Sequence, residues 1–193
     1  RAFDVLAPLK DLDLESILQW RNAPAVRQAM FTQHEISRDE HQAWFQRMQA
    51  DDTKLWFLCL NKSNEPCGVV YFTDLDYAQG SAFWGFYARP DATPGTGLRI
   101  SLDALEFAFS ELRIQKVNAE VLASNQKSLE MHKKVGFAKE GCFREQFFDG
   151  ERRIAVIRLG MLAGEWPGFR DSLKSHVAQM DAIAAQRRNP PKK

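Results

Sequence analysis

The feature that most constrains the fold of this 193-residue chain is the segment NQKSLEMHKKVGF, from Asn125 to Phe137. It follows 116–122, KVNAEVL, whose alternation of apolar and polar residues predicts a strand. A capping Asn at its start and a Gly after two lysines near its end predict a helix over 125–135. A strand that leads directly into a well-bounded helix indicates an α/β fold.

A second unit of the same kind precedes this one. The aromatic segment 83–88, FWGFYA, predicts a strand, and it runs into a loop that contains Pro and Gly. A helix is predicted over 96–112, because its apolar residues recur at helical spacing. Together the two units give the order strand, glycine loop, helix, strand, Asn-capped helix.

The remaining elements complete one domain, expected over 1–163. Further strands are predicted at 5–9, 56–60, 68–73, 138–147 and 153–162, and helices at 11–22 and from Ser37 onwards. Residues 164–193 are expected to form a C-terminal extension, with a helix over 169–186 and a basic tail, RRNPPKK. Docking on the domain is one interpretation of the apolar side of this helix. Self-association, as in a homodimer, is the other.

Composition excludes several classes of function. A formal net charge of +1 gives no reason to expect nucleic-acid binding, and no apolar run reaches the roughly 20 residues of a membrane span. The three cysteines are widely spaced, and neither they nor the four histidines form a metal-binding pattern. We therefore expect a cytoplasmic protein with no metal site.

The loop from Ala92 to Leu98, ATPGTGL, is the candidate phosphate-binding segment. Backbone N–H groups at a helix N-terminus form a ready receptor for a pyrophosphate. Gly95 and Gly97 allow close approach and a positive φ, and the hydroxyl groups of Thr93 and Thr96 add donors. A plain turn without a ligand is the alternative, because the pattern is short and is neither a P-loop nor a dinucleotide fingerprint.

These two units resemble the Gcn5-related N-acetyltransferase (GNAT) superfamily. The resemblance implies the GNAT fold, with a mixed central sheet of about seven strands and flanking helices. It also implies direct transfer of an acetyl group from acetyl-coenzyme A to a primary amine. Ala92 stands where the family usually has Gln or Arg. The implied coenzyme-binding residues are Phe86, Ala88, Ala92, Thr93, Gly95, Thr96, Gly97, Leu98, Asn125 and Ser128.

The resemblance also indicates catalytic residues. His132 occupies the place where many members have a proton-donating Tyr, one helical stripe on from Asn125 and Ser128. An imidazolium there would protonate the leaving thiolate. The alternative is a partly exposed helix residue beside two lysines. Backbone N–H groups around Tyr87 would polarise the thioester carbonyl. The candidate general bases are Asp74, Glu120 or a water held by Tyr87.

The N-terminal half narrows the acceptor. Segments 18–30, 36–45 and 69–76 resemble the branch of pseudaminic acid biosynthesis, which acetylates the 4-amino group of a UDP-linked amino-dideoxy sugar. The implied acceptor-binding residues are Arg21, Arg27, His41, Thr73, Asp74 and Tyr87. Trp20 and Trp44 are interpreted as core residues. An N-terminal acetyltransferase of ribosomal proteins and a non-catalytic acyl-CoA-binding domain stay open as alternatives.

Overall fold

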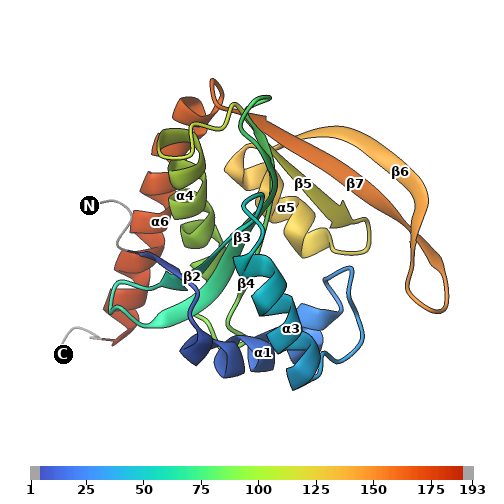
Figure 1. Ribbon diagram of the computed structural model, residues 1–193. Helices are drawn as coiled ribbons and strands as arrows, with labels where there is room; N and C mark the ends of the chain where they lie inside the picture. Colours follow the sequence, from blue (N-terminus) through green and yellow to red (C-terminus); the bar gives the residue numbers. More distant parts are fainter. Residues whose placement is uncertain (1–4, 189–193) are drawn as a thin grey trace.

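A seven-stranded mixed sheet forms the centre of the protein in the computed structural model, which describes residues 5–188 (Figure 1). Its strand order is β1-β2-β3-β4-β5-β7-β6, and β4–β5 is the parallel pair among antiparallel neighbours. The strands are β1 (Leu6–Pro8), β2 (Leu55–Leu60), β3 (Pro66–Asp76), β4 (Ser81–Ala88), β5 (Lys116–Leu122), β6 (Ala138–Phe148) and β7 (Arg153–Leu162). The predicted fold class and strand count are thereby confirmed.

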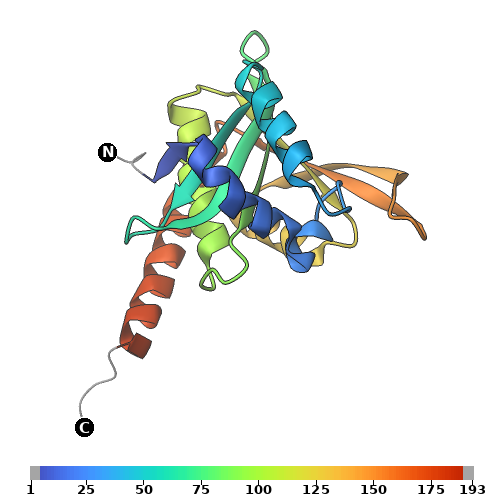
Figure 2. The same cartoon turned by 60° about the horizontal axis from the view of Figure 1, so that its bottom comes forward.

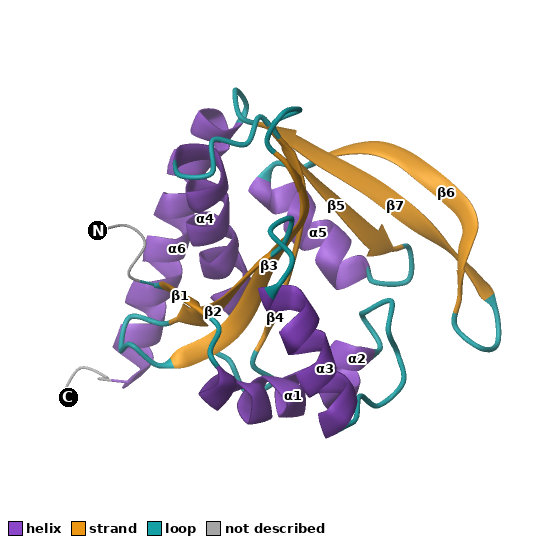
Figure 3. Ribbon diagram, in the orientation of Figure 1, coloured by secondary structure: helices purple, strands orange, loops and turns teal. Residues whose placement is uncertain are grey.

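The helices cover both faces of the sheet (Figure 3). They are α1 (Leu14–Asn22), α2 (Pro24–Arg27), α3 (Arg38–Gln49), α4 (Thr96–Ser110), α5 (Gln126–Val135) and α6 (Trp166–Arg188), with a 3-10 turn at Asp11–Asp13. The turn and α2 were not expected as separate elements. None of the helices in the described part of the chain is long and apolar enough to cross a membrane.

Each face of the sheet carries its own apolar cluster, because neighbouring residues of a strand point to opposite sides. Val70 and Phe72 of β3 belong to the larger cluster, with α4, α5 and α6. Val69 belongs to the smaller cluster, which Ile17 of α1 and Phe45 of α3 cover. The second face therefore carries a thin core, above which α1 and α3 can shape a binding site.

The predicted caps position α5. The Asn125 side chain accepts a hydrogen bond from the Ser128 N–H at 3.1 Å, and Gly136 closes the helix with φ of 113°. Ser37 caps α3 in the same way, accepting from the Glu40 N–H at 3.2 Å. Both helix starts therefore lie where their local sequence placed them.

The feature that prepares a site is the divergence of β4 and β5 (Figure 1). Their ladder pairs Ser81–Phe83 with 116–118, whereas β5 pairs with β7 along its whole length. Beyond Phe83 the two parallel strands separate. The C-terminal half of β4 therefore presents backbone N–H and C=O groups towards a gap in the sheet.

Two elements near the C-terminal end of the chain lie at the periphery of the domain, the β6–β7 hairpin and helix α6. The β6–β7 hairpin projects from the body, and Phe143 and Phe148 on it are exposed (Figure 2). Helix α6 packs on the domain, since Leu173 and Val177 join the larger cluster. The docked interpretation of this helix is confirmed. The end of the predicted basic tail, after Arg188, lies outside the described residues.

Candidate active site

The loop before α4 has the backbone geometry of an anion receptor. Gly95 is the N-cap residue, with φ of 91°, a conformation that favours glycine. The first helical hydrogen bond runs from the Arg99 N–H to the Gly95 carbonyl at 3.1 Å. The N–H groups of Gly97 and Leu98 precede it in the first turn, where no carbonyl lies behind them. They are therefore available to a phosphate.

One threonine of this loop acts differently from expectation. The Thr96 hydroxyl group is buried and donates to the Thr93 carbonyl at 2.7 Å, so it closes the turn. Thr93 is exposed and Ala92 is half-buried. Thr96 therefore stabilises the shape of the loop. Most of the hydrogen-bond donors that the loop can offer to a phosphate are then backbone N–H groups.

The loop lies against the separated half of β4. A Cβ atom added to Gly97 would be 3.4 Å from the Phe86 ring. Ala88, at the end of β4, is half-buried and packs on the larger cluster. The structure thus brings the predicted coenzyme residues of the loop and of β4 to one place, at the mouth of the gap between β4 and β5.

His132 on α5 is buried beneath this gap rather than partly exposed. Its Nδ1 atom lies 2.8 Å from the Ser128 carbonyl oxygen, and its ring contacts Trp84 and Phe137 edge-on. Burial lowers the pKa of His132 to about 4, and the bond to Ser128 opposes this only in part. The ring is therefore neutral at pH 7, donates from Nδ1, and has a lone pair on the buried, unpartnered Nε2. An imidazolium donor at neutral pH, as expected from the sequence, does not fit this environment.

A cavity of about 310 Å³ opens on the other face of the sheet, between α1, α3 and strands β2 to β4. It contains three of the predicted acceptor residues, Arg21, His41 and Tyr87. Burial raises the pKa of Tyr87, so its side chain stays a phenol. The other lining residues are Met30, Phe31, Thr32, Ile36, Glu40, Trp44, Arg47, Trp56 and Tyr71.

Unsatisfied polar atoms point to a ligand in this cavity. Arg21 Nη1, His41 Nε2 and Trp56 Nε1 are buried without a protein partner. Desolvation lowers the pKa values of Arg21 and His41. A buried polar atom without a partner costs about 1–3 kcal/mol, so a ligand that satisfies such atoms gains this energy on binding.

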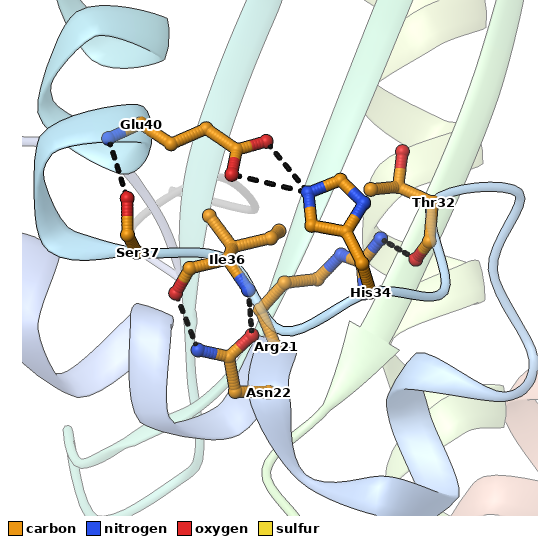
Figure 4. A network of polar contacts seen from close by, with 7 residues as sticks. All are labelled: Arg21, Asn22, Thr32, His34, Ile36, Ser37 and Glu40. Carbon is orange, nitrogen blue, oxygen red and sulfur yellow. Dashed lines mark hydrogen bonds and ion pairs between the residues drawn. The ribbon is translucent and has the colours of Figure 1, made fainter.

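A polar network fixes the wall of the cavity that lies between α1 and α3 (Figure 4). Arg21 Nη2 donates to the Thr32 carbonyl at 2.9 Å. The side chain of Asn22 makes two hydrogen bonds with the backbone of Ile36, at 2.8 and 2.9 Å. His34 lies 3.0 Å from the Glu40 carboxylate. The loop between α2 and α3 is therefore held at three points, Thr32, His34 and Ile36.

Three predicted acceptor residues lie outside the cavity. Arg27 on α2 pairs with Glu35 at 3.9 Å. Thr73 and Asp74 lie at an irregularity of β3, where Asp74 is exposed with φ of 49°. Glu120, the other candidate base, accepts two hydrogen bonds from Arg158, at 3.1 and 2.6 Å.

The sequence interpretation missed the aromatic wall of the cavity. Trp44, expected in the core, stacks on His41 with ring centres 5.0 Å apart. Trp56 stacks on Tyr71 at 4.2 Å. The signal was the alternation of residues in β2 and β3, which sends Trp56 and Tyr71 to the same face as Tyr87.

A second hollow, of about 630 Å³, is a weaker candidate. Five consecutive residues, Cys142 to Gln146, line it at the bulge of β6. None of the buried, unpartnered side-chain atoms found within 5–188 belongs to these residues. The hollow is therefore a consequence of the bulged strand rather than a prepared site.

A sheet that opens between two parallel strands beside a glycine-capped helix is the arrangement that the resemblance to acyl-CoA-dependent transferases implies. The particular family is shown by sequence: the profile of the acetyltransferase (GNAT) domain matches residues 5–138. The chain belongs to this family and is an N-acetyltransferase that uses acetyl-CoA.

Relatives with two different names match the chain over most of their length. Acetyltransferase PseH of Campylobacter jejuni strain 81-176 is 28% identical over 67% of this chain and 79% of its own length. The spermidine N(1)-acetyltransferase of Vibrio cholerae is 24% identical over 83% of this chain and 94% of its own. A crystal structure of that spermidine enzyme with CoA and spermine has a TM-score of 0.77, over 83% of this chain and 96% of that one.

Proposed function

We propose that this protein acetylates the 4-amino group of a UDP-linked amino-dideoxy sugar. The observation that carries the proposal is the cavity with its buried, unpartnered Arg21 Nη1 atom among stacked aromatic rings. A guanidinium is suited to a phosphate group, and a flat apolar wall to a uracil ring. The segments that resemble the pseudaminic acid branch, and the relatives named PseH, support the same acceptor.

The charge of the cavity argues against a polyamine. Its lining contains two arginines, Arg21 and Arg47, against one carboxylate, Glu40, which already pairs with His34. A polyamine is a multiply charged cation, and desolvating it beside guanidinium groups costs energy. The same argument disfavours the basic N-terminus of a ribosomal protein. An acceptor with phosphate groups instead compensates the arginines.

The volume of the cavity fits one part of such an acceptor. About 310 Å³ is at the lower end of the roughly 300–1,000 Å³ of small-molecule sites. We infer that the cavity takes the nucleotide end of the acceptor. The amino sugar would then extend towards the separated half of β4.

In the proposed reaction the protein acts by positioning and polarisation. Backbone N–H groups of β4 near Phe86 to Ala88 stabilise the developing negative charge on the thioester oxygen. The amine nitrogen bonds to the acetyl carbon, and the carbon–sulfur bond breaks to release the thiolate of coenzyme A. The amine proton passes to water, since Asp74 lies beside the start of β4, away from its separated half, and Glu120 pairs with Arg158.

The test is a thiol-release assay with acetyl-CoA and three acceptors offered in parallel. These are the UDP-linked 4-amino sugar, spermidine and a ribosomal N-terminal peptide. The proposal expects kcat/KM to be highest for the sugar nucleotide. Faster turnover of spermidine or of the peptide would overturn the acceptor. Calorimetric binding of acetyl-CoA without turnover of the sugar nucleotide would also overturn the acceptor.

A further inference from the structure

The last helix returns to the loop that is proposed to hold the coenzyme phosphates. Helix α6 runs antiparallel to α4 (Figure 1): Trp166 near its start donates to Glu106 near the end of α4 at 2.9 Å. Near its other end, Met180 lies against Gly95. A Cβ atom added to Gly95 would collide with the terminal methyl group of Met180. Helix α6 therefore packs against the N-cap of α4.

Next to this contact, a carboxylate on α6 joins two cations. Asp181 Oδ2 accepts from Arg99 Nη1 at 3.1 Å, and Asp181 also contacts Arg99 Nη2 and the Nζ atom of Lys62. The hydrogen bond from Arg99 lowers the pKa of Asp181 to about 2, so the carboxylate is charged at physiological pH. Side chains of Arg99 and Asp181 are only 21% and 23% exposed. The end of α6 is thus tied to the first turn of α4 and to the β2–β3 turn.

These contacts bear on the amides that a phosphate requires. Gly97 and Leu98 lie between Gly95 and Arg99, the two residues that α6 holds. A receptor made of backbone N–H groups binds well only when the groups are already aimed at the ligand, because ordering a loop during binding consumes affinity. The matching family profile ends at residue 138, so α6 lies outside the matched segment, as do β7 and nearly all of β6.

We propose that Met180 and Asp181 are positioning residues for acetyl-CoA. They act through Gly95 and Arg99, and they keep the N–H groups of the loop in place before the coenzyme arrives. This inference rests on the proposed role of the loop as the phosphate receptor. It concerns coenzyme affinity, and neither residue lines the acceptor cavity.

Met180→Ala is the principal test, because it removes packing without changing charge. We expect the Kd for acetyl-CoA to rise about fivefold, equivalent to about 1 kcal/mol. kcat at saturating coenzyme and the acceptor KM should stay unchanged. Hydrogen exchange at the amides of Thr96 and Arg99, which donate to the Thr93 and Gly95 carbonyls, should accelerate while the Tm is retained, a local effect that a general loss of stability would not produce. Ile183→Ala, an equivalent truncation at a residue 51% exposed on the same helix, is the control.

Asp181→Asn tests the ion pairs, with Asp181→Glu as the conservative variant that should restore binding. Weaker acetyl-CoA binding in Asp181→Asn supports the inference. Tighter binding would mean that the carboxylate competes with the coenzyme phosphates for Arg99 and Lys62, and would overturn its positioning role. Asp171→Asn, on an exposed residue of α6 that pairs with the adjacent Arg170, is the matched control.

The outcomes separate this inference from the proposed function. If the parent protein binds acetyl-CoA and Met180→Ala binds it equally well with unchanged exchange at Thr96 and Arg99, only the role of α6 is overturned. If the parent protein binds no acetyl-CoA, the role of the loop and the role of α6 are both wrong.

Discussion

Arg21 holds the Thr32 carbonyl with one nitrogen of its guanidinium and leaves the other buried without a partner. The Nη2–oxygen distance is 2.9 Å, and Nη1 is one of three such unpartnered atoms in the cavity wall. The contact to Thr32 fixes the direction of the side chain. A ligand group therefore meets a cation that is already aimed, without the entropy cost of ordering a long side chain.

Replacing Arg21 with Ala should raise the acceptor KM about 10–100-fold. A hydrogen bond between a charged pair contributes roughly 1.5–3 kcal/mol, and 1.4 kcal/mol corresponds to a factor of ten. The KM for acetyl-CoA should not change, which makes it the internal control in steady-state kinetics. Arg27→Ala is the matched variant, since Arg27 lies outside the cavity. Equal acceptor KM values in both variants would contradict the assignment.

Replacing Gly97 with Val should abolish acetyl-CoA binding. A Cβ atom alone would be 3.4 Å from the Phe86 ring, so two further methyl groups crowd the space between the loop and β4. Calorimetry with acetyl-CoA measures the loss, and circular dichroism checks that the fold is retained. Gly164→Val is the control, because nothing lies within 4 Å of a Cβ atom there. Retained affinity in Gly97→Val would show that the coenzyme does not approach this residue.

The fold could be predicted where the cause is local. The caps at Asn125 and Gly136 act within one helical turn, so the sequence alone located α5. The alternation in 116–122 likewise follows from burial of one side of a strand. Such signals need no knowledge of the rest of the chain.

The site could be predicted only in part, because its residues meet through tertiary packing. Arg21 and Arg27 look equivalent in the sequence, each near the end of a helix. The backbone breaks between them at Ala23, whose ψ is 132°, and this separates α2 from α1. Only one of the two arginines then lines the cavity. The protonation state of His132 similarly depends on burial against Trp84 and Phe137, which no spacing encodes.

Replacing His132 with Phe should lower kcat by less than tenfold at pH 7.5. The phenyl ring can keep the contacts with Trp84 and Phe137, while both ring nitrogens are lost. A neutral imidazole whose proton is on Nδ1, bound to Ser128, has no proton to offer from Nε2. A stopped assay of thiol release over pH 6–9 measures the effect. A drop of about 100-fold or more, the size of a lost proton donor, would reinstate His132 as the general acid.

The same variant should change how stability depends on pH. In the unfolded chain a histidine has a pKa near 6.5, whereas burial lowers that of His132 to about 4. Above pH 6.5 both states are neutral, and the native state bears no penalty. As pH falls from about 6.5 to 4, the unfolded state takes up a proton that the native state cannot, so the free energy of unfolding decreases. The shift corresponds to on the order of 3 kcal/mol once pH reaches 4.

Urea denaturation of the parent and of His132→Phe at pH 7.5, 6.0 and 5.0 measures this contribution. Other groups titrate in the same range, among them Asp103, whose pKa burial raises to about 6. They are common to both proteins, so the difference between parent and variant isolates His132. We expect the parent to lose more stability than His132→Phe between pH 7.5 and 5.0. Parallel losses in the two proteins would mean that His132 is protonated in the native state near neutral pH, as a proton donor requires.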